Sequence, residues 1–374
     1  MTNRIKSIVA VLLIGLMVFS LTACSGDTNE WAVKIGDQEI KTGVYLGYLV
    51  NNYLAAQDKT GKSGDDLFAV KIEEKTAEQW IKDQTMEDCT VYAYVEQFFA
   101  SENLELSKDD LTEITTTTDN AWKQVNLAYE KNGCSKESYR QIITSAKKAD
   151  KLFRHLYGEK GDRAVDLKEQ QSYFLKNYAK TKIIFESLAD PSNGQQLPKD
   201  KLDKIVKDFK QMTNDLIDGK KFDDLADKYN DSKKEETSGS SSSELSSKKE
   251  PEKDPARYEA VVNKNNSYFP QEVIDRLFDA SFKVNDPAFV QTSDYIFMMQ
   301  KMELTGDGKE FKDSQEEIIT ALRGDDFKKE LIAEGKKLKV EKNEAAIKRF
   351  SPKNIPGRFL EASEPMQPVG YPEA

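Results

Sequence analysis

The sequence is poor in the side chains from which metal centres and acid–base catalysts are commonly built. Among 374 residues it has a single histidine, His155, and three cysteines. One histidine cannot form a multi-histidine metal site, and no serine and aspartate can be assigned to it as a catalytic triad. His155 also lies off the apolar stripe of its expected helix, so we expect it at the surface. The sequence thus predicts no metal site, no catalytic residue set and no cofactor.

An excess of positive charge is absent as well. The formal net charge is −10 at pH 7. Proteins that bind nucleic acid present a basic face to the phosphate backbone, and an acidic chain is repelled by an anionic membrane surface. The composition therefore argues against a nucleic-acid partner and against electrostatic attachment to acidic lipids.

Long apolar runs are missing except at the N-terminus. There, Arg4 and Lys6 precede an apolar stretch, Ser7 to Leu21, which is too short to cross a membrane comfortably. Residues 1–23 are therefore predicted to be a signal peptide. No second run of this length follows, so nothing else is predicted to span the bilayer.

The end of this segment resembles a bacterial lipobox. It reads Leu21-Thr22-Ala23-Cys24, with small residues before the cysteine. The resemblance implies cleavage before Cys24 and attachment of lipid to its thiol; the alternative is an ordinary signal peptide followed by a cysteine by coincidence. Residues 24–30 then form a polar tether. We expect a protein anchored by lipid to the extracytoplasmic face of a bacterial cell membrane.

The other two cysteines, Cys89 and Cys134, fall on segments with helical periodicity. Outside the cell they could form a disulfide, but isolated cysteines on helices are more often small buried apolar groups. Cys134 precedes Ser135, a favourable N-cap, and Tyr139 follows four residues after that cap. This is the spacing of a hydrophobic staple, which gives Cys134 a structural role.

Residues 31–178 carry mostly helical patterns. Trp31 to Lys41 is predicted to be a small hairpin, because apolar residues flank the turn signal Gly36-Asp37. Amphipathic helices follow, with apolar residues at the spacing of one buried face. These helices are predicted at residues 42–56, 77–99, 119–131, 135–157 and 166–178, with a further one capped by Ser107.

Residues 179–304 show a different pattern, in which strand-like runs enclose helices. The order is strand, helix, helix, linker, helix, strand. The strands are predicted at 179–185 and 295–299, and the helices at 202–216, 221–230 and 269–284. The linker, Ser232 to Pro255, is dense in Ser, Lys and Glu and is predicted to be a flexible surface insertion.

Two motifs in this region resemble the parvulin family of peptidyl-prolyl isomerases, or rotamases. Lys221 to Tyr229 is similar to the family's F-x-x-L-A-x-x-Y, and Ala280 to Val284 is similar to its A-A-F-x-L. The resemblance implies a small sheet flanked by helices. The family's histidines, in H-I-L and Y-H-I-I, are replaced by Lys182 and Tyr295, and its glycine-rich G-G-D-L-G is absent. We therefore expect a parvulin-like module with a degenerate active site.

The apolar positions that line the peptide-binding cup of parvulins correspond to Val273, Leu277 and Phe282. All three also fit the core stripe of one helix, so a peptide-contacting role and a core role both stay open. Tyr295 keeps a hydroxyl that can donate a hydrogen bond. Lys182 brings a charge to a place where the family has a neutral ring, and a buried ammonium is costly unless it is paired or deprotonated.

The two ends of the chain resemble the SurA/PrsA type of extracytoplasmic foldase. The hairpin leads into a first long helix, and at the other end residues 311–322 and 325–339 are predicted to be helical. Residues 340–350 resemble the C-terminal helix of these foldases, which packs back on the N-terminal helices. The resemblance implies one helical chaperone domain made from residues 31–178 and 305–360. The last residues, 361–374, are predicted to be a disordered tail.

Together these patterns predict an α+β fold that is mostly helical, with the parvulin-like module inserted into the helical domain. The resemblance implies a membrane-anchored foldase or chaperone for unfolded or partly folded secreted proteins, with weak or lost isomerase activity. The alternative is a solute-binding lipoprotein of a transporter. That class alternates strands and helices in two α/β lobes, whereas strand signals occur here at only three places.

Overall fold

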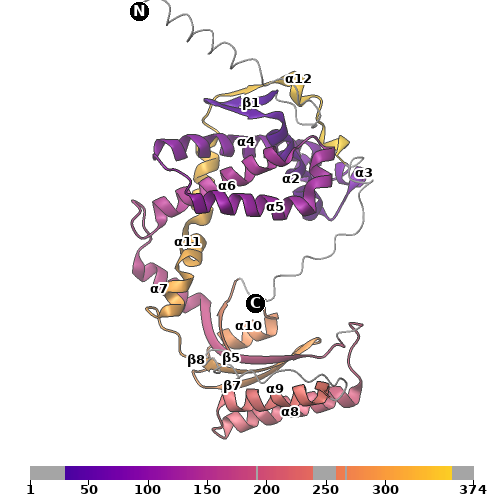
Figure 1. Ribbon diagram of the computed structural model, residues 1–374, viewed down its shortest axis with the longest axis vertical. Helices are drawn as coiled ribbons and strands as arrows, with labels where there is room; N and C mark the ends of the chain where they lie inside the picture. Colours follow the sequence, from indigo (N-terminus) through magenta and orange to yellow (C-terminus); the bar gives the residue numbers. More distant parts are fainter. Residues whose placement is uncertain (1–29, 191–192, 239–257, 266–267, 356–374) are drawn as a thin grey trace, which may run out of the picture. The chain divides into compact units, whose positions relative to one another are not determined.

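The computed structural model describes residues 30–190, 193–238, 258–265 and 268–355, and it shows an α+β fold in which helices predominate (Figure 1). The described residues divide into two compact units. The helical unit comprises residues 30–164 and 323–355, and the sheet unit comprises residues 165–322. The predicted signal peptide, Cys24 and the tail at 361–374 lie outside the described residues.

The helical unit opens with the predicted hairpin, which is confirmed. Gly36 turns the chain with a positive φ of 56°, a conformation that glycine adopts without strain. Val33, Ile35 and Ile40 are buried on the face that packs toward the helices. The strands are β1 (Trp31–Ile35), β2 (Gln38–Lys41) and, from the other end of the chain, β9 (Val340–Lys342), in the order β2-β1-β9.

Strand β9 corrects the expectation of a helix over 340–350. Val340 and Lys342 pair antiparallel with Ile35 and Val33, so the backbone groups of β1 that would otherwise form a sheet edge are hydrogen-bonded. Only one helical turn follows, and it begins after Asn343, whose side chain accepts a hydrogen bond from the Ala346 amide. The pairing joins the two chain ends within one small sheet.

Long helices form the body of the helical unit, where α2, α4, α5 and α6 pack together (Figure 1). Ser107 caps α5 with a reciprocal capping box, and Ser135 caps α6 between Cys134 and Tyr139, as predicted. The elements are α2 (Thr42–Thr60), α3 (Gly64–Phe68), β3 (Lys71–Ile72), β4 (Lys75–Thr76), α4 (Ala77–Ser101), α5 (Lys108–Lys131), α6 (Lys136–Tyr157), α12 (Glu344–Ile347) and η1 (Pro352–Asn354).

Cys89 and Cys134 are not joined by a disulfide, and both are fully buried. Cys89 lies on α4, and Cys134 lies where α2 passes close to α6 at Gly47. A Cβ at Gly47 would lie 2.5 Å from the Ile142 side chain and 3.3 Å from the Cys134 sulfur. The thiols act as small core groups, and the disulfide that the sequence left open does not form.

The sheet unit contains one antiparallel sheet of four strands in the order β6-β5-β8-β7. Two of its strands, β6 and β7, were missed by the sequence analysis. Its elements are α7 (Leu167–Asn177), β5 (Tyr178–Ser187), α8 (Lys199–Ile217), α9 (Phe222–Ser238), β6 (Glu259–Asn263), α10 (Gln271–Phe278), β7 (Pro287–Gln291), β8 (Tyr295–Met302) and the first part of α11 (Lys309–Gly335), up to Leu322.

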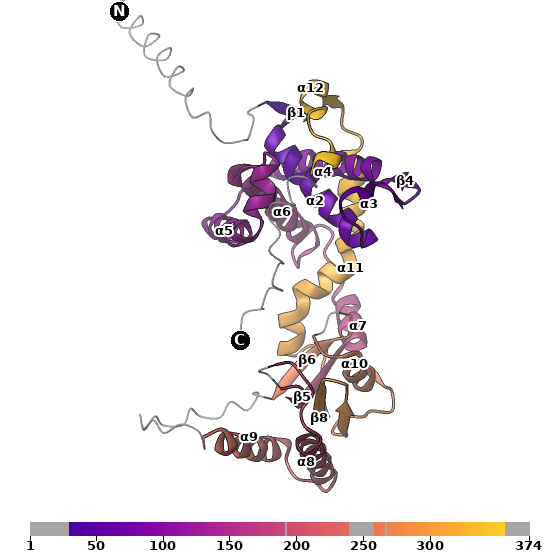
Figure 2. The same ribbon diagram turned by 90° about the vertical axis from the view of Figure 1, so that its right-hand side faces the viewer.

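Helices cover the two faces of this sheet. Helices α8 and α9 lie on one face and α10 lies on the other (Figures 1 and 2). Because side chains alternate along a strand, Ile184, Ile296 and Met298 pack toward α8 and α9. Phe297 and Met299 pack toward α10. The sheet therefore carries two separate small cores.

Several predicted boundaries change. The helix expected over 269–284 ends at Phe278, because Asp279 takes an extended conformation and its carboxylate accepts a hydrogen bond from the Ser281 amide. Helix α9 continues to Ser238, into the run that was predicted to be a flexible insertion from Ser232. The rest of that run, to Pro255, lies outside the described residues.

The C-terminal helical region also differs from its prediction. The two helices expected at 311–322 and 325–339 form the single helix α11. Its first part belongs to the sheet unit, where Phe311 and Ile318 pack with Phe174 of α7 and with Tyr178. Within the described part of the chain, no helix has the length and apolar character to traverse a bilayer.

Candidate functional site

Lys182 lies on strand β5 and points toward the face covered by α8 and α9. Its ammonium donates to both carboxylate oxygens of Asp223, at 2.8 and 2.7 Å. Asp223 sits in the first turn of α9, where the helix dipole favours a negative charge. The pair is partly shielded from water, with 18% and 32% of the two side chains exposed. The lysine is therefore committed to a structural ion pair.

Tyr295 lies on the opposite face. It begins strand β8 and shares the face of Phe297, which packs toward α10. Its ring centroid lies 6.0 Å from that of Phe185, in an edge-on arrangement, and the residue is 39% exposed. The structure thus separates Lys182 and Tyr295 by the thickness of the sheet, and no single pocket holds both side chains.

The three candidate cup residues lie together in the core between α10 and the sheet. Val273, Leu277 and Phe282 are buried and pack with Phe297 and Met299. None of them presents its side chain at the surface, so their burial describes a core role. A peptide-contacting role for them stays a prediction that would need α10 to move.

Lys301 fixes the end of α10. Its ammonium donates to the backbone carbonyls of Leu277 and Phe282, both at 2.9 Å. Leu277 lies in the last turn of α10, where backbone carbonyls have no partner within the helix. Burial lowers the pKa of Lys301, with the nearby charge of Lys283 adding to the effect. The guanidinium carbon of Arg276 lies 4.4 Å from the Phe282 ring centroid and holds that ring in place.

Aromatic side chains form the surface of the α10 face beside Tyr295. We call the set of Phe185, Phe269, Tyr295 and Phe297 the aromatic patch. Phe297 is buried at its centre, and its ring centroid lies 5.8 Å from Phe185, 6.2 Å from Tyr295 and 6.4 Å from Phe269. Phe185 is 57% exposed. The patch offers two exposed rings on a rigid, buried base, which suits contact with apolar or prolyl side chains.

The register of the sheet explains how the patch is assembled. Phe185 lies directly opposite Phe297 across the β5–β8 ladder, and Ser187 lies opposite Tyr295. Facing residues in an antiparallel pair point to the same side. The sequence analysis did not single out Phe185. The two-residue period of the run 179–185 was the signal that places its side chain on the other face of the sheet from that of Ile184.

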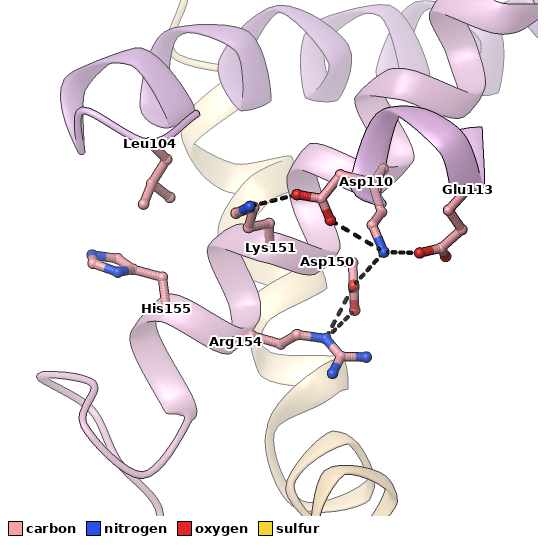
Figure 3. Close-up of a pocket in the computed structure, with 8 residues that line it drawn as sticks. Leu104, Asp110, Glu113, Asp150, Lys151, Arg154 and His155 are labelled. Carbon is pink, nitrogen blue, oxygen red and sulfur yellow. Dashed lines mark hydrogen bonds and ion pairs between the residues drawn. The ribbon is translucent and has the colours of Figure 1, made fainter. Parts of the chain in front are cut away.

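A second group of charged residues lines a surface pocket of about 600 Å³ in the helical unit (Figure 3). Lys147 and Lys151 form ion pairs with Asp110, at 3.7 and 2.5 Å, and Lys147 also pairs with Glu113 at 2.6 Å. The hydrogen bond from Lys151, together with those from Ser107, holds the pKa of the Asp110 carboxyl well below its usual range.

The charged side chains that line the pocket thus pair with one another. Arg154 pairs with Asp150 at 3.1 Å, and His155 lies at the rim, 43% exposed and 3.3 Å from Glu102. Each lysine and arginine that lines the pocket has a carboxylate partner, so no uncompensated charge is aimed at a ligand. Among the described residues, no three His, Cys, Asp or Glu side chains form a group that could hold a metal ion.

No family model matches the chain, and no curated protein matches it. Solved structures similar to it include foldase protein PrsA from Streptococcus pneumoniae (14% identity, 71% of this chain and 91% of that chain covered, TM-score 0.35) and from Lactococcus lactis (11%, 89% and 98%, 0.38). PrsA from Bacillus subtilis is similar at 14% identity, with 69% and 84% covered and a TM-score of 0.32. Likenesses this weak assign neither a family nor a function.

Proposed function

We propose that the protein is an extracytoplasmic foldase or chaperone that holds unfolded secreted chains through the aromatic patch, with weak or no prolyl isomerase activity. The observation that carries the proposal is the exposure of Phe185 and Tyr295 on a sheet face whose other apolar side chains are buried or partly buried. Exposed apolar patches on a folded surface mark sites of contact with other chains.

The distribution of apolar surface supports this location. Eleven large apolar residues are exposed in the described part of the chain, and only Leu111, Leu127 and Val340 belong to the helical unit. The other eight belong to the sheet unit. A chaperone that retains clients by apolar contact would therefore bind them mainly through the sheet unit.

Weak isomerisation follows from the polar groups around the patch. Rotation about a prolyl amide has a barrier of roughly 18–20 kcal/mol from amide resonance, and a catalyst must bind the twisted amide better than the planar one. Of the two replaced histidine positions, Lys182 is held by Asp223 on the other face, so only the Tyr295 hydroxyl remains beside the patch. Loss of a positioned group typically removes a factor of about 10² or more in rate.

The alternative function, a solute-binding lipoprotein, has less support. Such proteins rest on two lobes in which strands and helices alternate around mainly parallel sheets. Within the described ranges, every strand pair is antiparallel, in the sheets of both units. No pocket between two α/β lobes can be built from these elements.

Membrane attachment is part of the same proposal and rests on the Leu21-Thr22-Ala23-Cys24 motif. Cys24→Ala should release the protein from the membrane or block its maturation. Fractionation of the variant with mass determination of its N-terminus checks this. A variant that stays membrane-bound with a processed N-terminus would show that the motif is not a lipobox.

The function itself is tested by two assays on the mature protein. It should delay aggregation of a chemically unfolded secreted protein at near-equimolar ratio. In parallel, it should accelerate cis/trans exchange of a prolyl tetrapeptide far less than a parvulin that has both histidines. Failure to delay aggregation would exclude a chaperone role, and rapid exchange would make the protein an isomerase.

A further inference from the structure

Asp88 is a carboxyl group in the contact between helices α2 and α4 of the helical unit. Its oxygen accepts a hydrogen bond from the Asn52 side-chain amide at 2.6 Å. The same amide donates its other hydrogen to the Tyr48 carbonyl at 3.0 Å, so Asn52 has none left to give. No other hydrogen bond and no ion pair holds Asp88 within the described residues. An ionised carboxylate has about four acceptor positions, and this contact serves one of them.

The surroundings of Asp88 are apolar and aromatic. The neighbouring Thr85 and Cys89 are fully buried, and the rings of Tyr48 and Tyr92 meet edge-on with centroids 6.4 Å apart. Asp88 itself keeps part of its surface in contact with water, but the apolar and aromatic groups around it disfavour a bare negative charge. An uncharged carboxylic acid can still accept the Asn52 hydrogen bond, although more weakly than the carboxylate, and it has less need of further donors.

The charged groups that face Asp88 do not compensate it. Glu87 precedes it on α4 and pairs with Lys336 at 2.6 Å, while Lys328 of α11 acts on Asp88 only through space. Helix α2 presents Tyr48 and Asn52, which carry no charge. Burial raises the pKa of Asp88 to about 6, Glu87 adds to the rise, and Asn52 and Lys328 oppose it.

We propose that Asp88 is a proton-binding site that couples the packing of α2 on α4 to pH, so that the helical unit tightens as the medium becomes acidic. The unfolded carboxyl has an ordinary pKa of about 3.9. Between about pH 4 and 6 the folded protein then binds more protons than the unfolded chain, so stability falls as pH rises through this window. Above about pH 6 the folded protein carries the full free-energy cost of an ionised Asp88.

Urea unfolding of the mature protein and of Asp88→Asn, at pH 5 and at pH 8, tests the proposal. The ratio of the unfolding constant of the unmodified protein to that of the variant should rise about tenfold from pH 5 to pH 8, since only the acid can ionise. The matched control is Asp83→Asn on the same helix. Burial raises the pKa of Asp83, but hydrogen bonds from Lys75 and Gln79 outweigh it, and its pKa is lowered. Its ratio should be constant over this range.

A direct titration keeps the proposal testable even if Asp88→Asn does not fold. The side-chain carboxyl carbon of Asp88, followed by NMR in the unmodified protein, should titrate with a midpoint near pH 6. In Asn52→Ala the midpoint should move to higher pH, because the donor that favours the ionised form is gone. A midpoint below about pH 4.5, an unchanged midpoint in Asn52→Ala, or a constant ratio for Asp88→Asn would each overturn the proposal.

Discussion

The helical unit and the sheet unit bury their apolar residues to different degrees. In the helical unit, strand β9 returns from the far end of the chain to pair with β1, and Ile355 joins the core formed by the N-terminal residues. In the sheet unit, two smaller cores lie on either side of one sheet, and the aromatic patch stays open beside α10. The comparison indicates that the helical unit is the more completely buried body, and that the sheet unit carries the surface for which we propose client binding.

The difference follows from how many elements cover each apolar face. Helices α2, α4 and α6 pack on one another and on the sheet β2-β1-β9, so most of their apolar side chains are buried. On the α10 side of the four-stranded sheet, one helix of eight residues covers strands of up to ten. A helix rises 1.5 Å per residue and a strand about 3.4 Å, so α10 is too short to shield the ends of β5 and β8.

The largest effect is expected from removing the C-terminal elements of the helical unit. Deletion of residues 339–374 removes β9, α12 and Ile355, and should destabilise this unit by on the order of 5 kcal/mol. Hydrogen exchange read by mass spectrometry separates the units: protection should be lost in α2 and α4 and retained in β5 and β8. Deletion of 356–374 alone is the control. If α2 and α4 stay protected after the longer deletion, the two chain ends do not share a core.

A single close approach tests the packing of the helical unit more finely. Gly335 ends α11 against α4, and a Cβ there would lie 2.8 Å from the Thr90 carbonyl oxygen. Gly335→Ala should cost about 2 kcal/mol, because backbone atoms cannot yield as a side chain can. Gly61→Ala is the control, since nothing lies near a Cβ at that position. An alanine there would be strained only by the positive φ of 63°, which should cost about 1 kcal/mol. Urea midpoints measure both. Stabilisation by Gly335→Ala would mean that the two helices lie farther apart.

The ion pair on the covered face of the sheet should matter less. Lys182→Ala removes the partner of Asp223 and is expected to destabilise the protein by about 1 kcal/mol, because both side chains remain partly in contact with water. Asp223→Asn should cost a similar amount, and urea unfolding of both variants checks this. Client binding should be unchanged in each, and a loss of binding would place Lys182 in the site after all.

The smallest effect on stability is expected at the patch itself. Phe185→Ala should change the free energy of unfolding by less than about 0.5 kcal/mol, since the ring is mostly exposed. Phe209→Ala, in helix α8 on the other face of the sheet, should cost about 3–5 kcal/mol because this ring is fully buried. Equal losses in the two variants by urea unfolding would contradict the assignment of Phe185 to an open face.

The sequence predicted the local features of the fold better than the pairings between distant segments. The hairpin at 31–41 and the caps Ser107 and Ser135 depend on neighbouring residues and were found. Strands β6, β7 and β9 have five residues or fewer, and their pairing depends on segments far away in the chain. Such short runs carry too little periodicity to be recognised from the sequence.

The candidate site was predicted in part for a related reason. Tyr295 was singled out and lies at the patch, whereas Lys182 was assigned to the same pocket and lies on the other face. A shift of one residue along a strand moves a side chain to the opposite side of the sheet, so a motif alignment that is correct for the strand can be wrong for the face. Phe185 occupies the open face and could have been found by applying that alternation from Ile184.

The central claim is that unfolded clients bind at the aromatic patch and not through Lys182. The most direct test is the equilibrium affinity of the mature protein for a permanently unfolded client peptide that contains proline and aromatic residues. The affinity should fall about tenfold or more in the double variant Phe185→Ala with Tyr295→Ala, since aromatic side chains that become buried in a complex contribute most of the binding energy. It should stay within about twofold in Lys182→Ala. A double variant that binds as tightly as the unmodified protein would contradict the claim.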